Sequence, residues 1–154
     1  MKFILSVILF KGSLLSAYSQ VDYHEFKERY NLSCRVPDSA IIVGNQQLMD
    51  SLSSFEIVSG AEEFYYDHAW VYYMRYMKWK NKTDLQKAAD IWEEGWQEYD
   101  CLHCLKSIAG IYRHLDDCTK ALDLTELYLE EVPDTDEVDY KEIYMRYRRC
   151  RGKE

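Results

Sequence analysis

The feature that most constrains this chain is a short internal repeat. Lys87–Glu93 aligns with Lys120–Glu126 at an offset of 33 residues, and the same offset relates Trp79 to Tyr112. Self-similarity at a period of roughly 20–50 residues is typical of chains that stack copies of one supersecondary unit. The repeat therefore restricts the C-terminal part of the chain to architectures in which neighbouring units bury each other's apolar faces.

The pattern between the repeated positions predicts helices. Apolar residues recur at helical spacing, and the chain has only 6 Gly and 2 Pro to break long elements. Five helices are expected, of which the first is Ala61–Lys80. The second opens with a Thr83/Gln86 capping box and runs to Tyr99, and the third is capped by Asp100 and reaches Leu115. The fourth is capped at Asp116-Asp117 and ends before Pro133, and the fifth is capped by Asp136 or Asp139 and ends near Cys150. Turns of a few residues require these helices to pack as antiparallel neighbours.

Large and small residues in these helices stand where a known repeat family has them. The positions are Leu105, Ile108, Ala109 and Tyr112 with Ala121 and Pro133; Tyr72, Tyr76, Trp79, Ala88, Trp92 and Gly95 in the preceding unit; and Ile143, Tyr147 and Cys150 in an incomplete third. The chain resembles the tetratricopeptide repeats over about 90 residues. The resemblance implies an all-α fold of antiparallel helix hairpins, an α-solenoid of about two and a half units over residues 61–154. Arg75, Arg146 and Tyr128 depart from the family's pattern.

The N-terminal part is expected to pack on the repeats. Residues 20–60 are predicted to hold a short helix, Tyr23–Tyr30, then a loop, Asn31–Gly44, with an extended run at Ile41–Val43. A second helix is predicted over Asn45–Ile57, ended by Ser59-Gly60.

The first 19 residues have the pattern of a signal peptide. Lys2 precedes the apolar run Phe3–Phe10, and Ala17-Tyr18-Ser19 predicts cleavage before Gln20, although Lys11 interrupts the apolar region. The alternative is a buried first helix of a cytosolic protein. The apolar run is too short for an ordinary transmembrane span of about 20 residues, so none is expected. Export to a periplasm or cell envelope, or secretion, is the prediction.

Charge is unevenly distributed along the chain. The net charge is −8 overall, whereas residues 141–154 carry six basic and two acidic side chains. An acidic body repels phosphates over most of its surface, so nucleic-acid binding is not expected. A protein partner, or self-association through opposite ends, is compatible with this pattern.

Cys101 and Cys104 form the most suggestive chemical motif. A Cys-x-x-Cys pair at a helix N-terminus is typical of thiol oxidoreductases, but those enzymes place a strand before it, and here helices are predicted on both sides. The haem reading fails because Leu105 follows the second cysteine. A structural disulfide or packed cysteines are favoured over redox or metal chemistry.

No other arrangement indicates catalysis or a cofactor. The four histidines are scattered, no Gly-rich phosphate loop is present, and no acid/base pair stands out. Neither an enzyme activity nor a metal or cofactor is therefore expected.

One face of the predicted repeat helices is basic and aromatic. The resemblance implies that this face lines a concave groove, and the residues on it are Trp70, Tyr73, Met77, His103, Lys106, Arg113, His114, Lys141, Tyr144 and Arg148. Aromatic and Arg side chains are enriched at interface hot spots. The alternative is that residues 20–60 partly fill the groove.

These features predict an exported, non-catalytic protein–protein interaction scaffold. A small subunit of a cell-envelope assembly is expected, with a protein or peptide partner that has an acidic segment. Two alternatives stay open: a thiol-active envelope protein that uses Cys101 and Cys104, and a saccharide or small-molecule binder.

Overall fold

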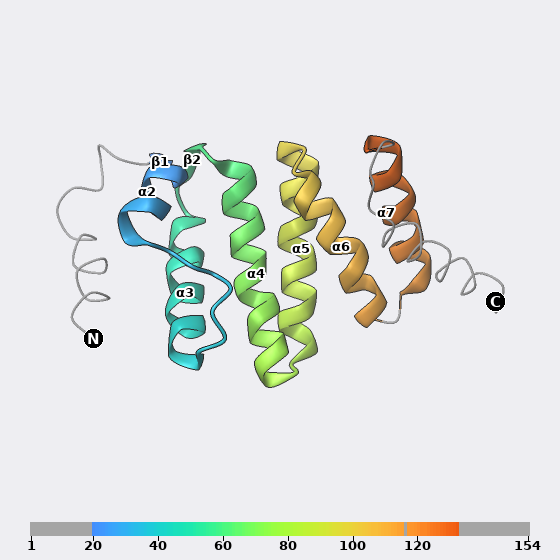
Figure 1. Cartoon of the computed structure of the whole chain (residues 1–154), viewed down its shortest axis with the longest axis horizontal. Helices are drawn as coiled ribbons and strands as arrows, with labels where there is room; N and C mark the ends of the chain where they lie inside the picture. Colours follow the sequence, from blue (N-terminus) through green and yellow to red (C-terminus); the bar gives the residue numbers. More distant parts are fainter. Residues whose placement is uncertain (1–19, 116, 133–154) are drawn as a thin grey trace.

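The computed structural model describes residues 20–115 and 117–132, which form a row of helices with a small sheet at one end (Figure 1). The elements in chain order are β1 (Gln20–Asp22), α2 (Tyr23–Tyr30), α3 (Ser39–Leu52), β2 (Glu56–Ser59), α4 (Ala61–Trp79), α5 (Lys82–Tyr99), α6 (Leu102–His114) and α7 (Cys118–Glu131). This part of the chain is mostly helical, as expected for an all-α protein. The predicted signal segment and the predicted last helix lie outside the described residues.

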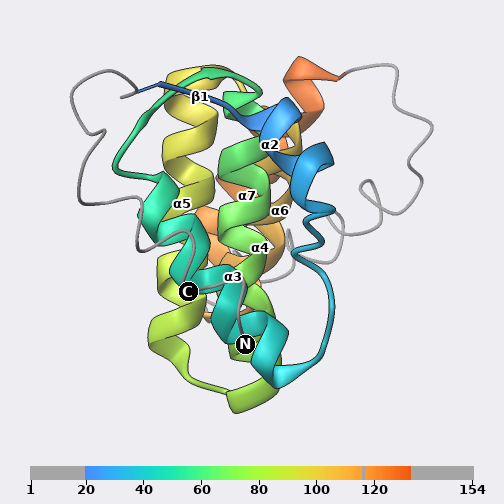
Figure 2. The ribbon, with the colours of Figure 1, turned by 90° about the vertical axis from the view of Figure 1, so that its left-hand side faces the viewer.

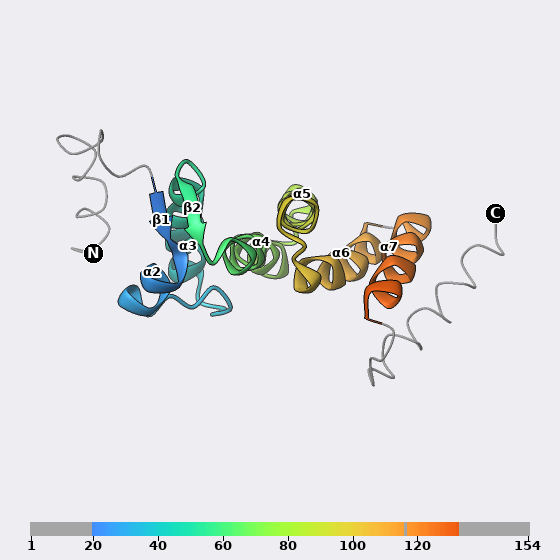
Figure 3. The same ribbon diagram turned by 90° about the horizontal axis from the view of Figure 1, so that it is seen from above.

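Helices α3 to α7 lie side by side in chain order (Figure 1). Because only two residues separate α4 from α5 and α5 from α6, each of these helices runs antiparallel to the next. Seen from above, α5 is displaced to one side of the row, while α4 and α6 lie on the other (Figure 3). Helix α4 consequently contacts α6 as well as α5, and one face of α4 and one face of α6 lie on the same side of the molecule.

The main core lies between α4, α5, α6 and α7. Leu85, Ala88 and Trp92 of α5 pack there with Ile108 of α6 and Ala121 of α7, all of them buried. Small residues such as Ala88 and Ala121 allow neighbouring helices to approach closely, and the large side chains fill the space beside them.

A second core attaches the N-terminal segment to α4. Tyr23 and Met49 are buried against Phe64 and Val71 of α4. Figure 2 looks from this end and shows α2 and α3 lying in front of α4. Residues 20–60 therefore pack against the first long helix.

The structure corrects the predicted start of α3. Helix was expected from Asn45, with Ile41–Val43 extended, but α3 begins at Ser39. The Asp38 carboxylate accepts hydrogen bonds from the backbone N–H groups of Ala40 (2.9 Å) and Ile41 (3.1 Å). This cap and the burial of Ile42 outweigh the preference of β-branched residues for strands.

The predicted end of that helix is also wrong. α3 ends at Leu52, and Glu56–Ser59 forms β2, which pairs in parallel with β1. The pairing joins Val21 to Ile57, two segments 36 residues apart. A strand pair this short gives no periodic signal of its own. The helical spacing that continues to Phe55 therefore predicts a helix longer than the one that forms.

Two predicted helix caps are shifted by one or two residues. Asn81, not Thr83, caps α5, because its side chain accepts the Thr83 N–H at 3.0 Å. Asp100 has a left-handed backbone (φ 51°) and ends α5, so that Cys101 becomes the N-cap of α6. With only two residues between α5 and α6, the first must close one helix and the second must open the next.

Trp79 was expected in the core but is 46% exposed. Helix α4 has 19 residues and α6 only 13, and the last ring of α6, His114, lies 6.5 Å from Tyr76. Trp79 therefore extends about one turn beyond the end of α6. The Arg75 guanidinium covers its ring at 5.7 Å and also bonds Asp84 of α5 at 3.1 Å, so Arg75 has a structural role at this position.

Candidate functional site

A cavity of about 290 Å³ lies between α4 and α6, on the side that these two helices share, and we call it the groove. Trp70 and Tyr73 of α4 form one wall, and Trp92 of α5 lies between the helices. The α6 wall is formed by Lys106, Ser107, Ala109, Gly110, Ile111, Arg113 and His114. Residues three and four apart on a helix share one face, which is why each helix offers a continuous strip to the groove.

The aromatic residues of the groove hold one another in fixed orientations. The ring of Trp70 meets those of Tyr73 and Trp92 edge to face, with centroids 5.1 and 5.8 Å apart. Trp92 is fixed further because its indole N–H donates to the backbone carbonyl of Tyr66 at 3.1 Å. Rigid aromatic surface loses little entropy when a partner covers it, and this favours its use as an anchor.

The indole N–H of Trp70 is a buried donor with no acceptor among the described residues. A buried N–H without a partner costs roughly 1–3 kcal/mol. An acceptor supplied by a ligand or by water would recover this cost.

Within residues 20–115 and 117–132, no carboxylate lines the groove, although the chain as a whole has a net charge of −8. Two cations line it, Lys106 and Arg113, together with His114. Partial burial lowers the pKa of His114, and the positive charges of Arg113 and Lys80 lower it further. The groove is thus a local concentration of positive charge and hydrogen-bond donors on an acidic protein.

The structure brings together five of the ten residues that were predicted to line the groove: Trp70, Tyr73, Lys106, Arg113 and His114. His103 lies further along the same face of α6, with its ring 5.6 Å from that of Tyr66. Met77 is 46% exposed and lies outside the cavity. Lys141, Tyr144 and Arg148 are not among the described residues.

Arg35 is a neighbour of the groove that the sequence did not reveal. Its guanidinium lies 5.2 Å from the ring centre of Tyr66 and 5.1 Å from that of Trp70. It belongs to the segment between α2 and α3, where no periodicity points to a contact with α4. The N-terminal segment therefore covers part of the aromatic surface formed by Tyr66 and Trp70. It adds a cation, not an acid, beside this end of the groove.

A larger cavity, of about 680 Å³, lies among β2, the first turns of α4 and the start of α6, and we call it the β2 cavity. Its charges are largely paired within the protein. Lys27 bonds Glu63 at 2.7 Å and Asp67 at 2.5 Å, and His24 bonds Glu63 at 2.8 Å. These ion pairs hold α2 on α4. The wall of the cavity that α2 and α4 form therefore has no excess positive charge, unlike the lining of the groove.

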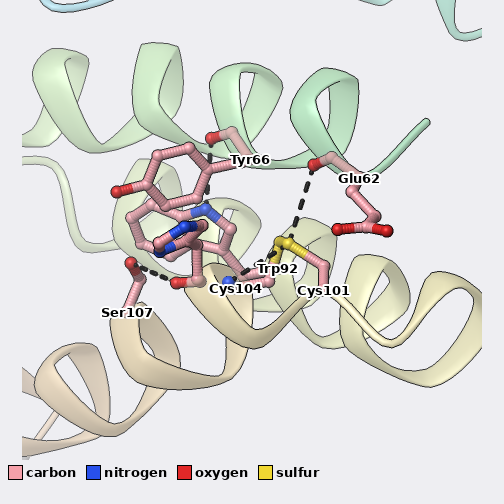
Figure 4. Close-up of a disulfide and its surroundings, with 7 residues drawn as sticks. Glu62, Tyr66, Trp92, Cys101, Cys104 and Ser107 are labelled. Atoms are coloured by element: carbon pink, nitrogen blue, oxygen red, sulfur yellow. Dashed lines mark hydrogen bonds between the residues drawn. A yellow bond between two sulfur atoms is a disulfide. The ribbon is translucent and has the colours of Figure 1, made fainter. Parts of the chain in front are cut away.

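A disulfide joins Cys101 to Cys104 at the edge of the β2 cavity (Figure 4). Cys101 is the N-cap of α6, and its Sγ accepts the backbone N–H of Cys104 at 3.2 Å. The carbonyl oxygen of Glu62 lies 3.6 Å from the same sulfur, a contact that becomes a hydrogen bond only when Cys101 is a reduced thiol. The bond closes a loop within one helical turn, so its effect on unfolded-chain entropy is small, about 2 kcal/mol.

The sequence matches no family model, and neither curated proteins nor solved structures show a significant similarity to it.

One partly buried polar cluster has the residue types of an acid/base site. His68 Nε2 lies 2.8 Å from Asp50, which also accepts the hydroxyl of Tyr72 at 2.9 Å. His68 is buried, and the cluster joins α3 to α4 without lining either cavity. It therefore serves as a link between helices.

Residues 20–115 and 117–132 contain no group of three or more His, Cys, Asp or Glu placed to hold a metal, and no helix among them is long and apolar enough to cross a membrane.

Proposed function

We propose that this protein is an exported docking scaffold whose groove is non-catalytic and binds an acidic segment of a partner protein. In this proposal the hairpins α4–α5 and α6–α7 act as two units of a tetratricopeptide-like α-solenoid. Such short arrays leave an end to be covered, which suits a small subunit of a cell-envelope assembly. The signal-like start of the sequence supports export.

One observation carries this proposal: on a chain of net charge −8, the described residues that line the cavity are aromatic, positively charged or neutral, and none of them is a carboxylate. The net negative charge disfavours an acidic partner over much of the rest of the described surface, so attraction is concentrated at the groove. The unpartnered N–H of Trp70 adds a donor beside the apolar surface. The best ligand is therefore a segment with several carboxylates and one apolar side chain as an anchor.

The test uses a defined peptide with four Asp or Glu residues around a single Leu, acetylated and amidated at its ends. Binding is followed by tryptophan fluorescence, because Trp70 and Trp92 both line the groove. Trp70→Ala should weaken binding by about 2 kcal/mol, close to thirty-fold, as expected for an anchor. Arg113→Ala should act mainly on the association rate and lose its effect in high salt.

Two controls make the result specific. Arg29→Ala removes an exposed cation of α2 outside both cavities and should bind normally. The same peptide with Asn and Gln in place of its acids should not bind. Normal binding by Trp70→Ala and Arg113→Ala, with loss of binding by Glu93→Ala or Glu126→Ala on the outer helices, would move the site to the opposite face. Binding of a neutral oligosaccharide in place of the peptide would favour a saccharide binder.

A further inference from the structure

The two sulfurs of the disulfide have different surroundings. Cys101 lines the β2 cavity, and Cys104 does not. Cys104 is fully buried, and its Sγ faces α5 so closely that a Cβ added at Gly95 would lie 3.1 Å from it. Cys101 is itself only 2% exposed, so a thiol can reach it only from within the cavity, where Cys101 and not Cys104 belongs to the lining.

The position of Cys101 favours a negative charge on its sulfur. As N-cap of a 13-residue helix, it lies at the positive end of α6 and accepts the N–H of Cys104. Arg35, Lys27, His24 and His103 line the same cavity. Three acids, Glu62, Glu63 and Asp67, line it too, and the last two are paired with Lys27, so the ionised side chains do not add to this preference, which rests on the helix end. The Glu62 carbonyl lies 3.6 Å from the same sulfur and stabilises the protonated thiol.

The disulfide does not join one helix to another. Both cysteines belong to the first turn of α6, so the bond leaves the packing of α4, α5 and α7 to the cores. A crosslink needed only for stability gains most when it closes a long loop, and this one closes the shortest loop that a Cys-x-x-Cys spacing allows.

We propose that the β2 cavity is a thiol–disulfide exchange site at which Cys101 is the reacting sulfur and Cys104 the resolving one, with a dithiol as substrate. A substrate thiolate attacks Sγ of Cys101, the Cys101–Cys104 bond breaks, and Cys104 leaves as a thiolate that takes up a proton. The second substrate thiolate then attacks the substrate sulfur of the mixed disulfide, and Cys101 leaves as a thiolate. The substrate has lost two electrons and two protons, and the two cysteines have gained them.

The experiment uses the whole chain with Cys118 and Cys150 replaced by Ser. Cys34 is retained as an internal control, because burial raises the pKa of its thiol to about 12. The protein is reduced with dithiothreitol while folded, and iodoacetamide labelling at pH 6–8 is followed by mass spectrometry of peptides. Cys101 should label at least about ten-fold faster than Cys104 and Cys34, with a thiolate present near neutral pH.

Single variants trap the intermediate. Cys104→Ala should form a stable mixed disulfide with a small thiol at Cys101, whereas Cys101→Ala should form none at Cys104. Equal labelling of Cys101 and Cys104, labelling that appears only in unfolding concentrations of urea, or a disulfide that resists dithiothreitol in the folded state would each overturn the proposal in favour of a structural bond. Peptide binding in the groove does not depend on this chemistry, so its loss or survival bears only on the docking function.

Discussion

At the scale of single residues, buried polar groups tie the N-terminal segment to the long helix α4. Asp67, buried in α4, accepts the hydroxyl of Tyr23 at 3.1 Å and the ammonium of Lys27. Asp50 of α3 likewise accepts hydrogen bonds from His68 and Tyr72 of α4. Because each buried group has a partner, removing one member leaves the other unpaired and costs more than the bond itself.

The burial of His68 makes stability depend on pH. Burial lowers the pKa of His68, and the nearby Asp50 only partly opposes that effect. The unfolded chain therefore binds more protons than the folded one as pH falls below about 6.5, and stability should decline over that range, by at most about 1.4 kcal/mol per pH unit. Melting temperatures from pH 8 to 5.5 should fall in the natural protein and change less in His68→Gln. Parallel curves for both proteins would contradict this account.

Two helical glycines should respond oppositely to alanine. A Cβ at Gly95 of α5 would lie 2.7 Å from Cβ of Tyr65, so Gly95→Ala must separate α4 from α5. Nothing lies within 4 Å of the corresponding position at Gly110 of α6, so Gly110→Ala should gain helix propensity at no steric cost. Their free energies of unfolding should differ by roughly 2 kcal/mol or more. Equal urea midpoints would place α5 further from α4 than described.

At the scale of elements, the sequence predicted helices best where apolar spacing was long and regular. The ends of α4, α6 and α7 lie within about two residues of their predicted positions. The elements predicted wrongly or not at all, α3, β1 and β2, lie within residues 20–60, where β-branched residues, a proline and polar turns give a weak local signal. There the outcome depended on contacts distant in sequence, such as the pairing of Val21 with Ile57 and the burial of Met49 on α4.

The corrected cap of α5 can be tested by a matched pair of substitutions. Asn81→Ala removes the acceptor of the Thr83 N–H and should destabilise the protein by about 1 kcal/mol. Thr83→Ala leaves that bond intact and should change stability by less than about 0.5 kcal/mol. Chemical denaturation of both variants shows which residue caps α5. A larger loss of unfolding free energy for Thr83→Ala than for Asn81→Ala would support the predicted Thr83/Gln86 capping box instead.

At the scale of the whole molecule, the candidate site combines features that the sequence could and could not provide. Helical spacing placed Trp70 and Tyr73 on one face of α4 and Lys106 and Arg113 on one face of α6. Spacing alone could not show that Trp92 of α5 separates these walls or that Arg35 covers Trp70. Those contacts depend on how three helices and a loop meet, which no single element specifies.

An acidic ligand in the groove should change the titration of His114. In the free protein, burial and the charges of Arg113 and Lys80 lower its pKa, and ligand carboxylates would raise it again. Binding therefore takes up protons, so affinity should increase as pH falls from 7.5 to 5.5, by at most about tenfold per pH unit. Titrations across this range with the natural protein and with His114→Gln provide the measurement. An equal pH dependence in both would exclude His114 from the site.

The most direct test of the docking account fills the groove while leaving the fold intact. Gly110 lines the groove and has open space beside it, so Gly110→Leu should occupy the cavity without overpacking the core. Isothermal titration with the acidic peptide should show at least about a ten-fold loss of affinity in Gly110→Leu, with an unchanged or higher melting temperature. Full affinity in a folded Gly110→Leu protein would contradict the account, because a ligand in this groove cannot share its space with the leucine side chain.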